Sequence, residues 1–263
     1  MTQDQLVQSR ITLKRKLRAR EKVFAGWTSF GHPSLTEIIA SAGVEFIGID
    51  LEHSTISQHE NQRIIASAQG LGALALPRLA SHNREMVKRV LDSGADGLIV
   101  PLVSSRAQAE EMASWGLYPP QGVRNFGVAR AQGYGFDYDA YTKHWNKGFI
   151  FIVQIETKEG VEQIDDILAV KAIDGVMVGP YDLSGSYGVP GQLRHPLVQK
   201  ACGRIVASCR RAGKACGTQI VDPDSQSTGK ALRAGFNFVI LDSDLFALWK
   251  WGERMRSIIQ EKA

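Results

Sequence analysis

The sequence predicts one α/β domain, spanning residues 1–263, with the fold of a (β/α)8 TIM-type barrel. Eight short apolar runs recur along the chain, and stretches with helical periodicity separate them, which is the pattern of parallel strands joined by crossover helices. Several runs follow directly after a glycine, as the short helix-to-strand loops of a barrel require. A length of 263 residues with 44% hydrophobic residues suits one large domain with a substantial core.

The predicted strands are AGWTSF from Ala25, FIGIDL from Phe46, ALALPR from Ala73, GLIVPLV from Gly97, FIFIVQIE from Phe149, GVMVGP from Gly175, ACGTQI from Ala215 and FVILDS from Phe238. The first crossover helix is predicted between Pro33, which suits a first turn, and Gly43, which suits a C-cap. Segments 83–94 and 224–235 show the same organisation, because each ends in a glycine just before the next strand.

One segment, 115–147, interrupts this pattern. It contains Trp115, the adjacent Pro119 and Pro120, and several glycines and aromatic residues without clear periodicity. We expect an irregular insert here. Long inserts in compact domains often act as lids or interface loops, so it is expected over the barrel mouth or in a subunit contact, and the alternative is a packed surface excursion.

Composition excludes several classes of protein. A net charge of +4, evenly spread, argues against nucleic acid as a partner. The chain has no apolar run of about 20 residues that could span a membrane and no apolar signal-peptide segment near its start, so we expect a cytoplasmic protein. The three cysteines, Cys202, Cys209 and Cys216, match no metal or redox spacing and are expected to be reduced.

Polar side chains follow the predicted strands where the strands end. These residues are Asp50, Glu52, His53, Arg78, Gln154, Glu156, Thr157 and Asp182. The carboxyl ends of barrel strands form one mouth, and strand alternation places Asp50 with Glu52, and Gln154 with Glu156, on a shared face. A single rim residue of this kind is commonly structural. Acids, an imidazole and a guanidinium that converge on one mouth indicate an active site.

Two carboxylates with open positions between them suit a hard divalent cation such as Mg²⁺ or Mn²⁺. A 2-oxo acid can chelate such an ion, which then stabilises the enolate formed when a carbon–carbon bond breaks. Arg78 would place a fixed positive charge beside the enolate oxygen. His53 is the natural proton carrier. The structural alternatives are an ion pair at the rim for Arg78 and a hydrogen-bonded rim residue for His53.

The chain contains, in this order, the motifs IDLEH, YPPQGVRNFG, QIET and GPYDLS. On these motifs most of the chain resembles the class II aldolases of the HpcH/HpaI group. The resemblance implies a general base in His53, an enolate-stabilising group in Arg78 and an acid in Asp92 that raises the basicity of the histidine. It further implies that Glu156 and Asp182 bind a divalent metal (Mg²⁺, Mn²⁺ or Co²⁺). It also implies that Arg78, Gln154, Tyr181 and Asp182 bind the substrate.

The resemblance also implies a homohexamer, a trimer of dimers, in which a domain-swapped C-terminal helix from 244–256 packs on a neighbour. The alternative is the ordinary last helix of the barrel. The chain departs from the family pattern where Asn125 and Phe126 follow Arg124, and at Tyr181, whose ring would narrow the pocket if it turned inward. Both departures affect the substrate rather than the chemistry.

We therefore predict a divalent-metal-dependent pyruvate aldolase that reversibly cleaves a 4-hydroxy-2-oxo acid to pyruvate and an aldehyde through a metal-stabilised enolate. Its expected partners are these small molecules. The first alternative is a CoA-thioester lyase of the citrate lyase β or malyl-CoA lyase type, although no basic, glycine-rich segment suits the CoA phosphates. A Schiff-base aldolase would need a desolvated lysine, for which Lys158 is the nearest candidate. A non-catalytic barrel would bind pyruvate without turnover.

Overall fold

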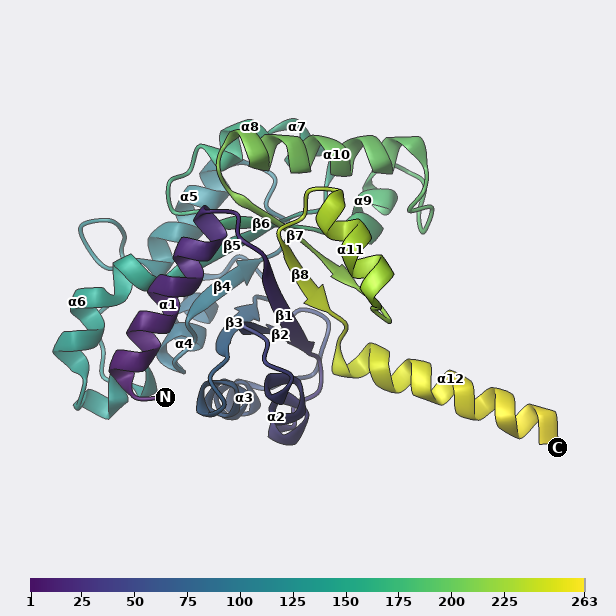
Figure 1. Cartoon of the computed structure of the whole chain (residues 1–263). Helices are drawn as coiled ribbons and strands as arrows, with labels where there is room; N and C mark the ends of the chain where they lie inside the picture. Colours follow the sequence, from purple (N-terminus) through teal and green to yellow (C-terminus); the bar gives the residue numbers. More distant parts are fainter. Residues whose placement is uncertain (263) are drawn as a thin grey trace.

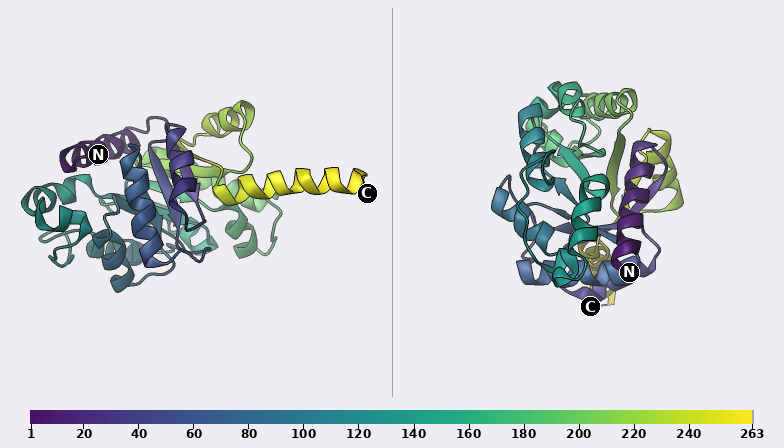
Figure 2. Two further views of the ribbon diagram at one scale, coloured as in Figure 1. Left: turned by 90° about the horizontal axis from the view of Figure 1, so that it is seen from below. Right: turned by 90° about the vertical axis from the view of Figure 1, so that its left-hand side faces the viewer.

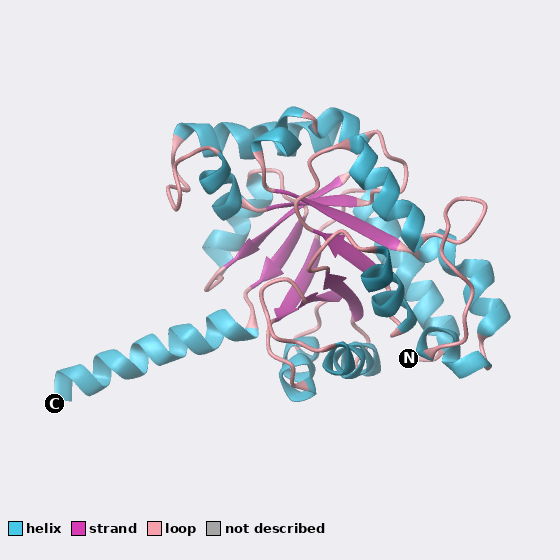
Figure 3. Cartoon of the chain, turned by 180° about the vertical axis from the view of Figure 1, so that it is seen from behind, coloured by secondary structure: helices cyan, strands magenta, loops and turns pink. Residues whose placement is uncertain are grey.

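The computed structural model, which describes residues 1–262, contains a closed barrel of eight parallel strands that follow one another around the ring in chain order (Figures 1 and 3). The strands are β1 (Val23–Thr28), β2 (Phe46–Asp50), β3 (Leu74–Arg78), β4 (Gly97–Val100), β5 (Ile150–Ile155), β6 (Gly175–Val178), β7 (Ala215–Ile220) and β8 (Phe238–Leu241). Seven of the eight predicted runs contain one of these strands, and the first run overlaps β1, which begins two residues earlier at Val23. The predicted barrel is confirmed.

Helices surround the barrel on its outer side (Figure 3). They are α2 (Pro33–Ser41), α3 (Gln58–Gly70), α4 (Arg84–Asp92), α5 (Arg106–Gly116), α7 (Lys158–Glu162), α8 (Ile164–Leu168), α9 (Pro180–Ser186), α10 (Pro196–Arg211) and α11 (Ser225–Arg233). The predicted boundaries of α2 are confirmed, since Pro33 lies in its first turn and Gly43 follows it with a φ of +84°.

The apolar side chains form two cores. One lies inside the barrel and includes Trp27, Phe46, Ile152 and Phe238. The other, larger core lies between the outer faces of the strands and the helices. Because side chains alternate along a strand, each of the strands β2 to β7 contributes to both cores, whereas β1 and β8 contribute to the inner one. This double burial explains why these strands are apolar throughout.

The first helix, α1 (Gln3–Arg18), was not predicted from the sequence. Its Leu13 and Leu17 are buried and join the inner core at the amino-terminal end of the strands, so the helix closes that end of the barrel. Its buried face also includes Arg10, whose guanidinium lies 3.3 Å from the buried carboxylate of Asp96. A charged residue on the inner face obscures the apolar periodicity of this helix.

The insert is more regular than predicted. After an irregular stretch it forms the 3-10 helix η1 (Arg130–Gly135) and the helix α6 (Tyr138–Gly148), which packs against α1 (Figure 1). It connects α5 to the start of β5, at the amino-terminal end of the barrel. The expectation that it covers the mouth of its own barrel was therefore wrong, because an active site lies at the opposite end. Buried Arg124 fixes the insert by stacking on Tyr118 and Trp145, with ring centroids 4.8 and 4.5 Å away.

The last helix, α12 (Asp244–Lys262), leaves the barrel and projects away from it (Figures 1 and 2). It therefore does not pack as the ordinary last helix of its own barrel. Its exposed apolar side chains are Leu245, Leu248, Trp249, Trp251, Met255, Ile258 and Ile259. No helix within residues 1–262 has the length and apolar character that crossing a membrane demands.

Candidate active site

The carboxyl ends of β2 and β3 bring Asp50 and Arg78 together. The two residues are register partners in the sheet. The Nη2 of Arg78 donates to both carboxylate oxygens of Asp50 at 2.8 Å, and its Nε donates to Oδ1 at 3.2 Å. Both side chains are almost fully buried. Asp50 thus fixes the guanidinium at the barrel mouth through a charge-assisted, forked contact.

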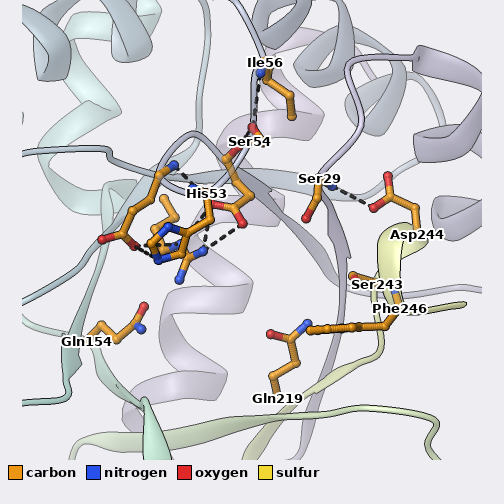
Figure 4. Close-up of polar contacts among 12 residues, drawn as sticks. Ser29, His53, Ser54, Ile56, Gln154, Gln219, Ser243, Asp244 and Phe246 are labelled. Atoms are coloured by element: carbon orange, nitrogen blue, oxygen red, sulfur yellow. Dashed lines mark hydrogen bonds and ion pairs between the residues drawn. The ribbon is translucent and has the colours of Figure 1, made fainter. Parts of the chain in front are cut away.

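Glu52 and His53 lie beside this pair, in the loop that follows β2. Oε2 of Glu52 lies 3.2 Å from Nε of Arg78 and 3.8 Å from Nε2 of His53. Burial raises the pKa of Glu52, although the charges of Arg78 and His53 oppose this shift. The His53 ring is 68% exposed at the rim, where substrate can reach it, and its backbone N–H donates to Asp50 at 3.0 Å (Figure 4).

The opposite side of the mouth holds Glu156, which follows β5 and is 3% exposed. Its Oε1 accepts a 2.7 Å hydrogen bond from the backbone N–H of Leu102, and its Oε2 accepts from the side-chain amide of Gln154. Burial is the main cause that raises the pKa of Glu156 to about 7, and the charges of Asp182 and Glu52 add to the shift. Three carboxylates therefore lie close enough to repel one another.

Gly179, which lies between β6 and α9, leaves room for the side chains of Glu156 and Gln154. A Cβ at this position would lie 2.7 Å from Oε2 of Glu156 and 3.2 Å from Nε2 of Gln154. The absence of a side chain lets the start of α9 approach Glu156 closely. Asp182 lies in the first turn of α9 and is exposed. β6 and α9 thus present the second carboxylate that the sequence predicts for the metal.

The donor set fits a hard divalent cation. Glu156 and Asp182 provide carboxylate oxygens, and the side-chain oxygen of Gln154 is buried without a hydrogen-bond partner. A cation would relieve the carboxylate repulsion, and a water or substrate group could satisfy the unpaired amide oxygen. Within residues 1–262, no three His, Cys, Asp or Glu side chains group as a complete ligand set. Two protein ligands with water and substrate suit Mg²⁺-like ions.

Two predicted site residues lie elsewhere. Asp92 ends α4, where its carboxylate pairs with Arg124 at 3.2 Å, and it does not contact His53 within the chain. Within one chain the acid beside His53 is Glu52, and the predicted effect of Asp92 on His53 stays a prediction. The Tyr181 ring is 66% exposed and does not narrow the pocket. Only its backbone, next to Asp182, remains a candidate for binding substrate.

The remaining candidates have structural roles. Thr157 caps the start of α7 through its hydroxyl, which accepts from the N–H of Gly160. The Lys158 side chain is 53% exposed and lies 4.0 Å from Glu162, so it is not the desolvated amine that a Schiff-base aldolase requires.

Leu102 and Gly179 also belong to the site, but were not predicted from the sequence. Leu102 has a φ of +55°, a conformation that only a few per cent of non-glycine residues adopt. No sequence signal indicates that its N–H binds Glu156. Gly179 was recognisable as a glycine between a strand and a helix that starts with proline, but its contact with Glu156 needs the folded chain.

Comparisons with known proteins show the family of this chain. Residues 24–250 match the family described as HpcH/HpaI aldolase/citrate lyase. The 2-keto-3-deoxy-L-rhamnonate aldolase of Salmonella gallinarum is 35% identical over 233 residues, which cover 88% of this chain and 86% of that enzyme.

Two solved structures are also similar. A HpcH/HpaI aldolase/citrate lyase family protein from Burkholderia cenocepacia has a TM-score of 0.88 and 28% identity, with 95% of this chain and 99% of the other covered. The citrate synthase SbnG has a TM-score of 0.82 and 27% identity, with 96% and 98% covered.

The barrel, its rim of acids with one arginine and one histidine, and these relatives define a class II aldolase, a carbon–carbon lyase. The predicted class of enzyme is thereby confirmed. More particularly, the chain belongs to the HpcH/HpaI aldolase/citrate lyase family, whose aldolases depend on a divalent metal.

Proposed function

We propose that this enzyme cleaves a 4-hydroxy-2-oxo acid of the 2-keto-3-deoxy sugar-acid type to pyruvate and a hydroxylated aldehyde, and catalyses the reverse addition. The observation that carries this proposal is the placement of Arg78, fixed by Asp50, at the same mouth as Glu156 and the unpaired amide oxygen of Gln154. The relative that is a 2-keto-3-deoxy-L-rhamnonate aldolase supports the substrate class.

Glu156 and Asp182 would hold a divalent ion, Mg²⁺, Mn²⁺ or Co²⁺. When bound, such an ion acts as a Lewis acid that polarises the 2-oxo group of the substrate. Gln154 would donate or accept a hydrogen bond at the oxo-acid end of the substrate, next to Glu156. The backbone of Tyr181 and Asp182, at the start of α9, would bind the same end.

Arg78 provides a fixed positive charge where the oxygen on C2 becomes negative. Since Asp50 and Glu52 hold the guanidinium before substrate arrives, little reorganisation is needed during the reaction. Removing one preorganised group of this kind typically raises the barrier by about 3 kcal/mol. Arg78 thus stabilises the enolate that forms on bond cleavage.

His53 would move the proton. Its exposed ring takes the proton from the C4 hydroxyl, directly or through one water. The electron pair of that O–H bond then forms the C=O bond of the aldehyde at C4. The C3–C4 bond breaks, and its electron pair passes to C3 and the oxygen on C2. A proton delivered to C3 then gives pyruvate. Glu52, 3.8 Å from Nε2, would stabilise the protonated imidazole. Asp92 has no part in this mechanism within one chain.

A CoA-thioester lyase is the second candidate, because the family description that the chain matches also includes citrate lyase. A CoA-thioester lyase requires a CoA ester to reach the mouth of the barrel. Assays with free hydroxy-oxo acids and with CoA esters, run in parallel, separate the two candidates. Release of pyruvate from the free acids alone supports the aldolase.

We also propose that α12 exchanges between copies of the chain in a homohexamer built from three dimers, and that the enzyme is cytoplasmic. Figure 2 shows α12 projecting away from the other elements of residues 1–262. Its exposed apolar side chains support the exchange. A contiguous apolar surface of this kind marks a protein–protein contact.

The test of the proposed function is a pyruvate-release assay on a panel of 4-hydroxy-2-oxo acids that includes 2-keto-3-deoxy-L-rhamnonate, with Mg²⁺, Mn²⁺ or Co²⁺. We expect His53→Ala and Arg78→Ala to lose at least 100-fold in kcat (~3 kcal/mol). Arg106→Ala, which alters only an exposed ion pair with Glu110, is the control and should retain activity. Full activity in the His53 and Arg78 variants would refute the assignment.

A further inference from the structure

We propose that Trp27 is a positioning residue whose indole face supports the guanidinium of Arg78 from inside the barrel. This inference rests on the proposed role of Arg78 in stabilising the enolate. The central carbon of the guanidinium lies 5.0 Å from the centroid of the Trp27 ring, and Trp27 is 3% exposed. At this distance a cation interacts favourably with the negative face of an aromatic ring.

The strand register shows how the ring reaches Arg78. Trp27 on β1 is the register partner of Gly48 on β2, and Asp50, two residues further along β2, is the partner of Arg78 on β3. The Trp27 side chain must therefore cross β2 to meet a residue two strands away. A Cβ at position 48 would lie 2.2 Å from the six-membered part of the indole. Gly48 provides the space through which the ring passes.

The ion pairs of Arg78 do not already support the face of its guanidinium, which is the role proposed for Trp27. Asp50 and Glu52 bind Nε and Nη2, which fixes one edge of the guanidinium. Contacts at one edge do not prevent the plane from tilting into the barrel. The indole closes the space on that side and keeps water from one face. Among the described residues, Nη1 of Arg78 has no hydrogen-bond partner, so this N–H is free for substrate.

Trp27 could instead be only a large residue of the inner core. The two readings differ in what they require, since support of a cation needs an aromatic face whereas core filling needs volume. Phenylalanine keeps a face, and leucine keeps apolar volume without one. For Trp27→Leu we expect a 3- to 30-fold loss in kcat, the range of a partly or fully desolvated cation–π contact. For Trp27→Phe we expect a loss of about threefold or less.

Gly48→Ala tests the same contact from β2, because its methyl group displaces the ring. In the wild-type background it should lower kcat as Trp27→Leu does. In the Trp27→Leu background it should add little, because the ring with which it clashes is gone. Equal kcat values for the Leu and Phe variants at position 27, or fully additive losses in the Gly48–Trp27 double variant, would overturn the proposal.

A spectroscopic measurement tests the contact without any substrate. The chain contains five tryptophans, and within residues 1–262 only the ring of Trp27 contacts Arg78. We expect Arg78→Met to change tryptophan emission of the full-length protein in the wild-type background and to leave it unchanged in the Trp27→Phe background. An emission spectrum that does not respond to Arg78→Met would refute the contact. If the contact is present but no oxo acid is cleaved, the proposed function fails and the contact stands.

Discussion

Asp50 and Arg78 pair directly across the carboxyl ends of β2 and β3, and one guanidinium nitrogen lies 2.8 Å from both carboxylate oxygens. This forked contact depends on the planar shape of arginine, which lysine lacks. Arg78→Lys keeps the charge but loses the second contact and the position of the charge. We expect kcat for pyruvate release to fall about 100-fold, as for loss of one preorganised donor. Arg106→Lys is the matched control on an exposed ion pair. A loss below threefold in Arg78→Lys would contradict the assigned role.

Gly179 should be required for metal binding although it has no side chain. A methyl group there would lie 2.7 Å from Oε2 and 2.9 Å from Cβ of Glu156, so Gly179→Ala must displace that carboxylate. We expect weaker metal affinity, at least tenfold lower kcat and a loss of about 1–3 kcal/mol in stability. Gly185→Ala in the same helix meets nothing within 4 Å and should keep full activity. Metal titrations and thermal melts of the two variants check this, and equal behaviour would refute it.

The metal-free protein should lose stability as pH rises toward neutrality. The pKa of Glu156 is about 7 in the folded chain, against an ordinary value of 4.5. Between these values the folded chain holds a proton that the unfolded chain releases, so the free energy of unfolding falls as pH rises through this window. Glu156→Gln removes this titration. Its Tm relative to wild type should therefore be higher at pH 8 than at pH 5.

Two controls accompany that measurement. Glu159→Gln replaces an exposed carboxylate on α7 and should show no such pH-dependent difference in Tm. Saturating Mn²⁺ at pH 8 should stabilise the wild type more than the Gln variant, because binding to the folded state raises its stability. Glu156→Gln and wild type could instead differ in Tm by the same amount at pH 5 and at pH 8. That result would argue against the burial of the Glu156 carboxyl group.

The apolar side of α12 should control assembly. Leu248 lies on the exposed apolar stripe of this helix, and Leu248→Lys would place a charge in the proposed contact between copies. We expect a smaller particle in light scattering after size exclusion. Ser257→Lys introduces the same charge on the polar side of the same helix and should keep the wild-type mass. An unchanged mass for Leu248→Lys would contradict the exchange of α12.

The strands and most helices could be predicted because their signals are local. Runs buried on both faces are apolar throughout, and Pro33 and Gly43 fix a helix start and stop by backbone geometry. The helix α1 lacked such a signal, since its buried face includes Arg10. α6 was missed because its buried face consists of Tyr141, Trp145 and a glycine, which gives a weak apolar period.

Within the site, Arg78, Glu156 and their neighbours could be predicted from their positions at strand ends, because the barrel brings the carboxyl ends of all strands to one mouth. Asp92 could not be placed in this way. Its partner depends on how the insert folds back to bring Arg124 against α4, a contact across 32 positions of the chain. The hydrogen bond from Leu102 to Glu156 comes from a backbone N–H, and no side-chain motif reports it.

Glu156 and Asp182 would together bind one divalent ion, and a 2-oxo acid would complete the coordination of that ion. Mn²⁺ titration followed by electron paramagnetic resonance tests it directly, with and without pyruvate. We predict one tightly bound ion per chain, tighter binding with pyruvate, and loss of both effects in Glu156→Gln and in Asp182→Asn. Unchanged Mn²⁺ binding in either variant would contradict the claim.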